Sequence, residues 1–198
     1  MKPTEILKSE HRVIEQVLDC LEKITTNCSK SGELNVGESE RAIDFLCVFA
    51  DRCHHAKEEQ CLFPMMERNG YSSQSGPTAV MRSEHDLGRE CIKGMRNAIK
   101  MAFTGDMTGQ RSFNGFARQY IELLRQHIQK EDHCLFAMAD QTLSDADQAK
   151  LQEQFESIER VHPGEHERYL MLANDLADSL GVSRKIELST CTTCCGKH

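Results

Sequence analysis

The chain has 198 residues, of which 39% are hydrophobic, and a formal net charge of −7 at pH 7. This length supports one sizeable hydrophobic core, and no apolar run approaches the roughly 18 residues of a membrane-spanning helix. Lysine and arginine form no block, so the composition favours neither nucleic acid nor an anionic membrane surface. Small molecules and ions are the expected partners.

The amino-terminal segment is charged from its first residues and lacks the apolar region and cleavage site of a signal peptide. We therefore expect a cytoplasmic protein. Of the ten cysteines, all but the last three are scattered through helical-looking segments, where we interpret them mostly as reduced, small core residues.

Apolar residues recur at three- and four-residue spacing, and the alternation typical of strands is missing, which predicts an all-α fold. The first helix is expected from about Thr4 to Asn27. The second is expected from about Ser39 to Asn69, and a loop rich in glycine and serine follows it at residues 70–77.

Three further helices are expected at about 78–103, 109–140 and 144–181, and Pro163 should kink or interrupt the last of them. Long helices joined by short loops predict an up-down four-helix bundle with the additional helix packed outside it. The expected domains are a bundle at 1–180, with ligand-bearing helices at about 4–140 and the extra helix at about 144–180, and a cysteine-rich tail at 181–198.

Two of the predicted helices carry the same pattern. Residues 54–63 and 127–136 match without a gap at His, Lys, Glu, Cys, Leu and Phe. In each segment a histidine precedes a glutamate by four positions, which places an imidazole and a carboxylate side by side on one helix face. Two such faces opposed across a bundle would supply nitrogen and oxygen ligands suited to iron, manganese or zinc.

A histidine lies on the apolar stripe of each of the first four helices, and in two of them the glutamate lies there too. One inward histidine is usually a hydrogen-bonded core residue. Several such groups in one core, carboxylates among them, would cost several kcal/mol each unless a metal ion pairs with them. The sequence therefore predicts a metal centre. Its predicted ligands are His11, His54, Glu58, His85, His127 and Glu131.

The histidines at 54–55 and the glutamates at 58–59 are adjacent pairs, and the sequence leaves open which member of each pair binds the metal. His55 faces a more polar sector than His54, so we favour His54 and Glu58 as ligands. His55 and Glu59 could instead orient the ligands from outside, or one of them could be a ligand. Tyr120 lies on the same stripe as the fourth-helix ligands. It is either a packed aromatic residue or a group that contacts iron or a bound peroxide.

Two further groups of residues could bind metal. His162 and His166 are four residues apart, but Pro163 and Gly164 disfavour a regular turn between them, so we interpret both histidines as solvent-exposed. The carboxyl-terminal cysteines, with a histidine at the end of the chain, could form a second metal or redox site or could be inert. These residues are Cys191, Cys194 and Cys195.

The order of these motifs resembles the hemerythrin-like (HHE) proteins. The resemblance covers about residues 4–140 and rests on Glu10-His11, the run from Cys53 to Pro64, Glu84-His85 and His127-x-x-x-Glu131. It implies a four-helix bundle that holds two non-haem iron ions, bridged by an oxo or hydroxo group and by the carboxylates of Glu58 and Glu131. It also implies iron chemistry with dioxygen, peroxide or nitric oxide.

One position departs from the family pattern. The oxygen-carrying hemerythrins have five histidine ligands, and Arg89 occupies the position of the second one on the third helix. One iron would then lack a nitrogen ligand unless His55, Tyr120 or water fills the gap, which favours an open, reactive or sensing site. A di-iron peroxidase or oxidase served by an electron-donor protein, an iron or oxygen sensor, and an iron donor for cluster repair with an acceptor protein all stay open.

Overall fold

The structure, a computed structural model, describes residues 1–103 and 107–185, and every regular element in these ranges is a helix. Helix α1 (Pro3–Ser31) starts with a proline at its first position, where the missing N–H costs nothing. It ends at Gly32, whose φ of 74° is the left-handed conformation that glycine adopts readily. The helix therefore continues one turn beyond Asn27, its predicted end.

The second helix of the bundle is continuous but changes its winding. Asn35 caps its start by accepting a hydrogen bond from the N–H of Glu38. Within its central part the N–H of Ala56 bonds to the C=O of Asp51, five residues back, which defines π-helical geometry. In chain order its parts are α2 (Val36–Phe45), π-helical segments at Leu46–His55 and Glu58–Leu62, and α3 (Phe63–Arg68).

The remaining helices follow the predicted order. The helix expected at 144–181 consists of two helices, because the chain turns at residues 161–164 around Pro163. The elements are α4 (Pro77–Phe103), α5 (Met107–Lys130), a π-helical segment at Glu131–Leu135, α6 (Phe136–Thr142), α7 (Asp145–Arg160) and α8 (Glu165–Leu180).

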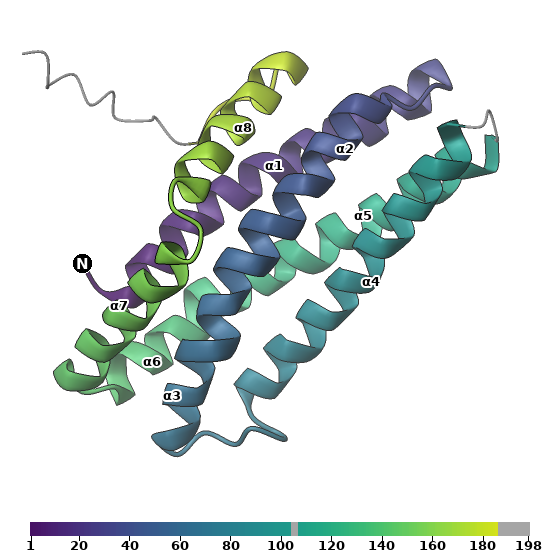
Figure 1. The fold of residues 1–198 in the computed structure, drawn as a ribbon. Coiled ribbons are helices and arrows are strands. Elements are labelled where there is room, and N and C mark those ends of the chain that lie inside the picture. Colours follow the sequence, from purple (N-terminus) through teal and green to yellow (C-terminus); the bar gives the residue numbers. More distant parts are fainter. Residues whose placement is uncertain (104–106, 186–198) are drawn as a thin grey trace, which may run out of the picture.

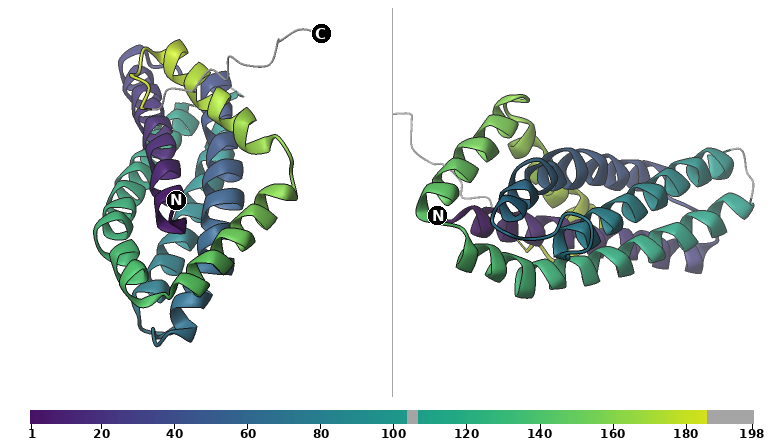
Figure 2. Two further views of the ribbon diagram at one scale, coloured as in Figure 1. Left: turned by 90° about the vertical axis from the view of Figure 1, so that its left-hand side faces the viewer. Right: turned by 90° about the horizontal axis from the view of Figure 1, so that it is seen from below.

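The elements up to Thr142 form four long helical rods, and Figure 1 shows them packed as an up-down bundle. Helix α1 packs against α2 and α5, and α4 packs against the same two helices from the other side. Helices α7 and α8 lie outside the bundle along α1, as the two further views in Figure 2 show. The predicted all-α bundle with an additional carboxyl-terminal element is confirmed. Among the described residues, no helix is long and apolar enough to cross a membrane.

The apolar core consists of two clusters, one toward each end of the bundle. The first includes Val13 and Ile128, and the second includes Leu7 and Leu135. Since His11 and Glu131 lie between these positions along α1 and the α5–α6 rod, the predicted ligands form a polar layer between two apolar clusters. Such a layer is shielded from water on both sides.

Candidate metal centre

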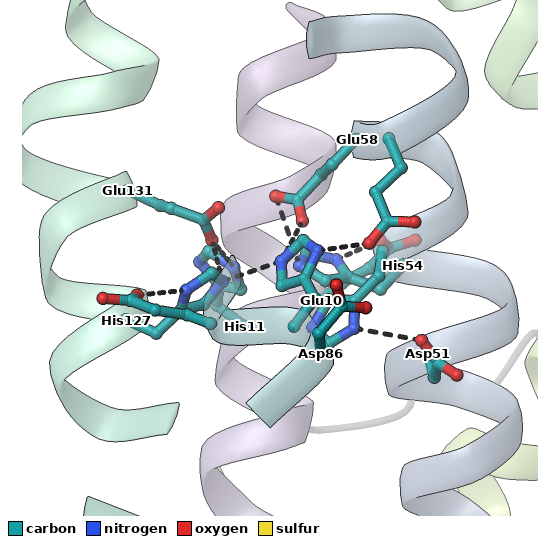
Figure 3. A network of polar contacts seen from close by, with 12 residues as sticks. Glu10, His11, Asp51, His54, Glu58, Asp86, His127 and Glu131 are labelled. Atoms are coloured by element: carbon teal, nitrogen blue, oxygen red, sulfur yellow. Dashed lines mark hydrogen bonds and ion pairs between the residues drawn. The ribbon is translucent and has the colours of Figure 1, made fainter. Parts of the chain in front are cut away.

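The structure brings all six predicted ligands together, and it adds His55 to them. Each of these seven residues is at most 5% exposed. Figure 3 shows several of these imidazoles and carboxylates turned toward one another in the interior of the bundle. Helix α1 supplies His11, the second rod supplies His54, His55 and Glu58, α4 supplies His85, and the α5–α6 rod supplies His127 and Glu131.

The seven side chains form two groups, in each of which the potential ligand atoms lie within 4.8 Å of one another. Glu58 belongs to both groups. One group consists of His11, His54, Glu58 and Glu131, and the other of His55, Glu58, His85 and His127.

The interior position of His55 was not predicted by a 3.6-residue period. That period turns His55 toward polar neighbours when His54 faces the core. In the π-helical stretch that ends at His55, hydrogen bonds run five residues back, so each turn holds more residues. Both adjacent histidines are buried as a result. A third π-helical segment starts at Glu131, and Cys134 within it is exposed, although the sequence analysis interpreted such cysteines mostly as core residues.

Several buried polar atoms at the centre have no hydrogen-bond partner among the described residues. They are Nε2 of His11, Nε2 of His54 and both carboxylate oxygens of Glu58 and Glu131. They lie close together: Nε2 of His11 is 3.3 Å from Oε2 of Glu131, and Nε2 of His54 is 3.6 Å from Oε1 of Glu58. Unpartnered polar atoms are costly in a core, and a cation among them satisfies their lone pairs. The residues present therefore fit a metal site.

The other ring nitrogen of each histidine faces a carboxylate. A carboxylate only accepts, so in the neutral ring Nδ1 carries the proton and Nε2 keeps a lone pair directed toward the cluster. The Nδ1–oxygen distances are 2.7 Å for His11 and Asp132, 2.9 Å for His54 and Glu10, 3.4 Å for His55 and Asp51, 2.7 Å for His85 and Glu59, and 2.9 Å for His127 and Glu84.

A cationic side chain contacts each of these carboxylates in turn. The contacts are Arg12 with Asp132, Lys57 with Glu10, Lys130 with Glu84, and Arg89 with both Asp51 and Glu59. Such contacts keep the carboxylates charged. For Glu10, burial alone would raise the pKa, but the hydrogen bond from His54 and the charge of Lys57 lower it to about 2.

These outer carboxylates and cations were missed by the sequence analysis, except for Glu59. A signal was present, because Glu10, Glu84 and Asp132 are each adjacent in sequence to a predicted ligand. The partner of each of these three carboxylates, however, is a histidine of another helix. Glu84, next to His85, contacts His127 instead.

The metal-free cluster holds a proton between two histidines. Burial alone would lower the pKa of His127, but the charge and close approach of Glu131 and a hydrogen bond to Glu84 raise it to about 9. Burial and the nearby His55 lower the pKa of His85 to about 3. The two Nε2 atoms are 3.0 Å apart, so the protonated ring of His127 donates to the lone pair of His85.

The two central carboxylates also influence one another. Burial and the charge of Glu131 raise the pKa of Glu58 well above its usual value. For Glu131, the positive charge of His127 and the close approach of His11 outweigh burial and lower the pKa. A divalent cation would stabilise both carboxylates in the ionised form.

Tyr120 is buried beside the three-histidine group. It lines a small cavity of about 10 Å³ together with His55, His85 and Gly88. A Cβ atom on Gly88 would lie 3.4 Å from the Tyr120 ring, so ring and backbone are in close contact. The contact between Tyr120 and a bound metal or small ligand stays a prediction.

Two further groups, the carboxyl-terminal cysteines and the pair of His162 and His166, were considered as possible metal sites. Cys191, Cys194 and Cys195 lie outside the described residues. His162 is exposed, as predicted, whereas the prediction for His166 is wrong, since its side chain is only 29% exposed and reaches toward Glu10.

Comparisons with known proteins agree with this geometry. The family described as Hemerythrin HHE cation binding domain matches residues 2–139. Proteins named iron-sulfur cluster repair protein YtfE, from Escherichia coli O1:K1 / APEC, Escherichia coli strain SMS-3-5 and Escherichia fergusonii, are each 37% identical over 89 residues. That alignment covers 43% of this chain and only 40% of each relative. No solved structure matches the chain. Because the matched region spans most of the chain and contains the whole His/Glu cluster, the protein belongs to the hemerythrin HHE cation-binding domain family.

Proposed function

We propose that the cluster binds two iron ions, one in each group of ligand atoms. The donors are imidazole nitrogens and carboxylate oxygens, a mixture that suits iron in a reactive, non-structural site. The first ion would have His11, His54, Glu58 and Glu131 as ligands, and the second His55, His85, His127 and Glu58.

Glu58 and Glu131 are positioned to bridge the two ions. Glu58 belongs to both groups of ligand atoms. Oε2 of Glu131 lies 3.3 Å from Nε2 of His11 and 3.2 Å from Nε2 of His127, so this carboxylate reaches ligands of both ions. Two bridging carboxylates would offset part of the charge of the metal pair inside an apolar core.

The two ions would have unequal surroundings. The first group offers two imidazoles and the second offers three, with His55 supplying the nitrogen donor that Arg89 does not. The first ion therefore has more room for a small external ligand, and we propose that dioxygen, peroxide or nitric oxide binds there. Iron, when bound, would supply Lewis acidity and electron transfer. The apolar clusters on both sides would keep bulk water away from the bound ligand.

The observation that supports this proposal best is the convergence of unpartnered, buried ligand atoms whose imidazoles are all fixed from behind by carboxylates. The test is to titrate the anaerobic ferrous protein with nitric oxide and to follow its optical and electron paramagnetic resonance spectra. We expect saturable binding to the wild-type protein and a loss of most of it in His54→Ala. Unchanged spectra on addition of nitric oxide would contradict the proposal.

A second candidate function is iron donation for repair of iron–sulfur clusters. The similarity to proteins named for that role favours it, and the cysteine-rich end of the chain could contact the acceptor protein. Anaerobic incubation of the iron-loaded protein with an apo-ferredoxin should then transfer iron stoichiometrically. Iron that stays bound in the presence of the acceptor would argue against donation. The free thiols of the described cysteines suit a reducing compartment, so we propose a cytoplasmic location.

A further inference from the structure

Three side chains of different chemistry meet on the outer side of the metal centre. They are Glu10 of α1, Cys53 of the second rod and His166 of α8, and one potential ligand atom of each lies within 4.8 Å of the others. Glu10 is buried, and the other two are half-buried. Helix α8 lies beyond residues 2–139, so this cluster joins the family domain to its carboxyl-terminal extension.

The nitrogen of His166 in this cluster has no partner. Its Nδ1 atom is buried and forms no hydrogen bond with another described residue. The atom is 3.9 Å from Oε1 of Glu10, which is too far for a hydrogen bond. Two ligands about 2.1 Å from one tetrahedral ion lie roughly 3.4 Å apart, so the observed separation is close to that of two atoms that share a metal ion.

A cavity adjoins two of the three residues. It has a volume of about 30 Å³, and both Cys53 and His166 line it. Glu159, His162 and Glu165 line it as well, so potential metal ligands make up half of its wall. The space is large enough for an ion or a water molecule.

The charges around the cluster favour a cation. Lys57 contacts Oε1 of Glu10 and lies 2.6 Å from Oε1 of Glu159, so one positive charge faces two negative ones. A divalent ion held beside these groups would offset the excess of negative charge. The ion therefore complements the charge of its surroundings despite the nearby ammonium group of Lys57.

We propose that Glu10, Cys53 and His166 form a further site for one divalent transition-metal ion. Sulfur, nitrogen and oxygen donors together suit zinc, cobalt or ferrous iron and disfavour calcium or magnesium. Through Glu10, which also holds His54, an ion at this site is linked to the buried centre by a single side chain. The site does not depend on which metal the buried centre holds.

The test uses Co²⁺ as the probe, because a cobalt–thiolate bond gives a charge-transfer band in the near ultraviolet and the buried His/Glu centre contains no cysteine. The full-length protein carries Cys191→Ser, Cys194→Ser and Cys195→Ser, so that the carboxyl-terminal thiols cannot contribute. The buried centre is first loaded with two equivalents of iron per chain, so that no iron is left for the further site, and Co²⁺ is then titrated. We expect a thiolate band that saturates at one Co²⁺ per chain.

Cys53→Ser in the same background should abolish the band, and His166→Ala should weaken Co²⁺ binding at least about tenfold. Cys61→Ser, which removes a buried thiol of the second apolar cluster, is the control and should leave the band unchanged. His166 is half-buried near the start of α8, so its removal should not prevent folding even if that of Cys53 does. Absence of the band in the parent protein, or full cobalt affinity in His166→Ala, would overturn the proposal.

Discussion

The imidazole rings of His55 and His85 stack with their centroids 3.8 Å apart and their planes 13° apart. Arg89, one helical turn after His85, does not enter the cluster. Its guanidinium instead bonds to Asp51 and Glu59, the carboxylates that hold these two rings. Arg89 occupies the position where the family pattern has a histidine ligand. Through Asp51, it helps to orient His55 of the neighbouring helix, and His55 can supply the nitrogen ligand in its place.

This arrangement predicts that His55→Ala removes one iron and leaves the other. The second ion would lose one of its three imidazoles, whereas the first would keep its whole ligand set. Iron content of the purified variant, measured against protein concentration, should fall from two per chain to about one. His133→Ala is the control, because His133 is exposed in the same kind of π-helical segment. Two irons retained in His55→Ala would remove His55 from the ligand set.

Glu58→Gln should have opposite effects on metal binding and on the stability of the metal-free protein. A neutral amide cannot bridge two cations, so we expect iron content to fall to one per chain or less. Burial and Glu131 raise the pKa of Glu58, which means that the folded state disfavours its ionised form. The metal-free variant should therefore be more stable at neutral pH, by on the order of 1 kcal/mol or more in chemical denaturation. A less stable metal-free variant would contradict this account.

The pKa of His127 predicts how pH affects metal affinity. In the metal-free protein this histidine is protonated up to pH about 9, so a metal ion must displace a proton in order to bind. Affinity should rise by up to about tenfold for each pH unit between 7 and 9, with proton release that a pH indicator detects. A pH-independent affinity across this range would exclude the displaced proton.

The same group predicts an effect on stability. Its pKa is raised in the folded protein, so its contribution is present below its usual pKa near 6.5 and disappears as pH rises toward 9. The melting temperature of the metal-free protein should therefore decrease over this interval. His127→Gln should reduce that dependence, and equal slopes in both proteins would contradict the assignment.

Glu84→Gln tests the carboxylates that hold the histidines. Loss of such a partner typically weakens metal binding by roughly 10–100-fold, because the ring orientation and basicity of the ligand are no longer fixed. We expect this loss for the ion bound by His127, measured by competition with a chelator. Glu90→Gln, at an exposed position of the same helix, should bind metal as the wild-type protein does. Equal affinities in the two variants would show that Glu84 does not act on the centre.

Removal of the chain after Ser189 tests the cysteine-rich end. Iron content should not change, because every proposed ligand, including His166 of the further site, lies before residue 189. Iron transfer to an acceptor protein should slow if these cysteines take part in donation. Peroxide consumption that survives the truncation would exclude them from a peroxidase reaction.

Helical periodicity predicted the bundle and the burial of the six candidate ligands because both follow from local sequence. His54 and Glu58 lie one turn apart, as do His127 and Glu131, so the apolar stripe alone identifies them as inward-facing. The position of His55 could not be predicted this way. The π-helical hydrogen bonds around it shift the phase of the helix, and no residue type in the sequence specifies them.

Contacts between side chains of different helices are the second feature of the site that local sequence does not predict. Glu10 contacts His54, which is 44 residues away, and His166 meets Glu10 only because α8 packs back along α1. The sequence identified Pro163 as an interruption but not where the following helix would dock. The outer hydrogen bonds of the centre and the cluster at Cys53 both depend on such packing.

Mössbauer spectroscopy of the full-length protein, loaded with isotopically enriched iron, tests the central claim most directly. If Glu58 and Glu131 bridge two ions, the oxidised protein should contain two irons per chain in a magnetically coupled pair with a diamagnetic ground state. A single iron per chain, or two ferric ions that behave independently, would contradict a bridged di-iron centre.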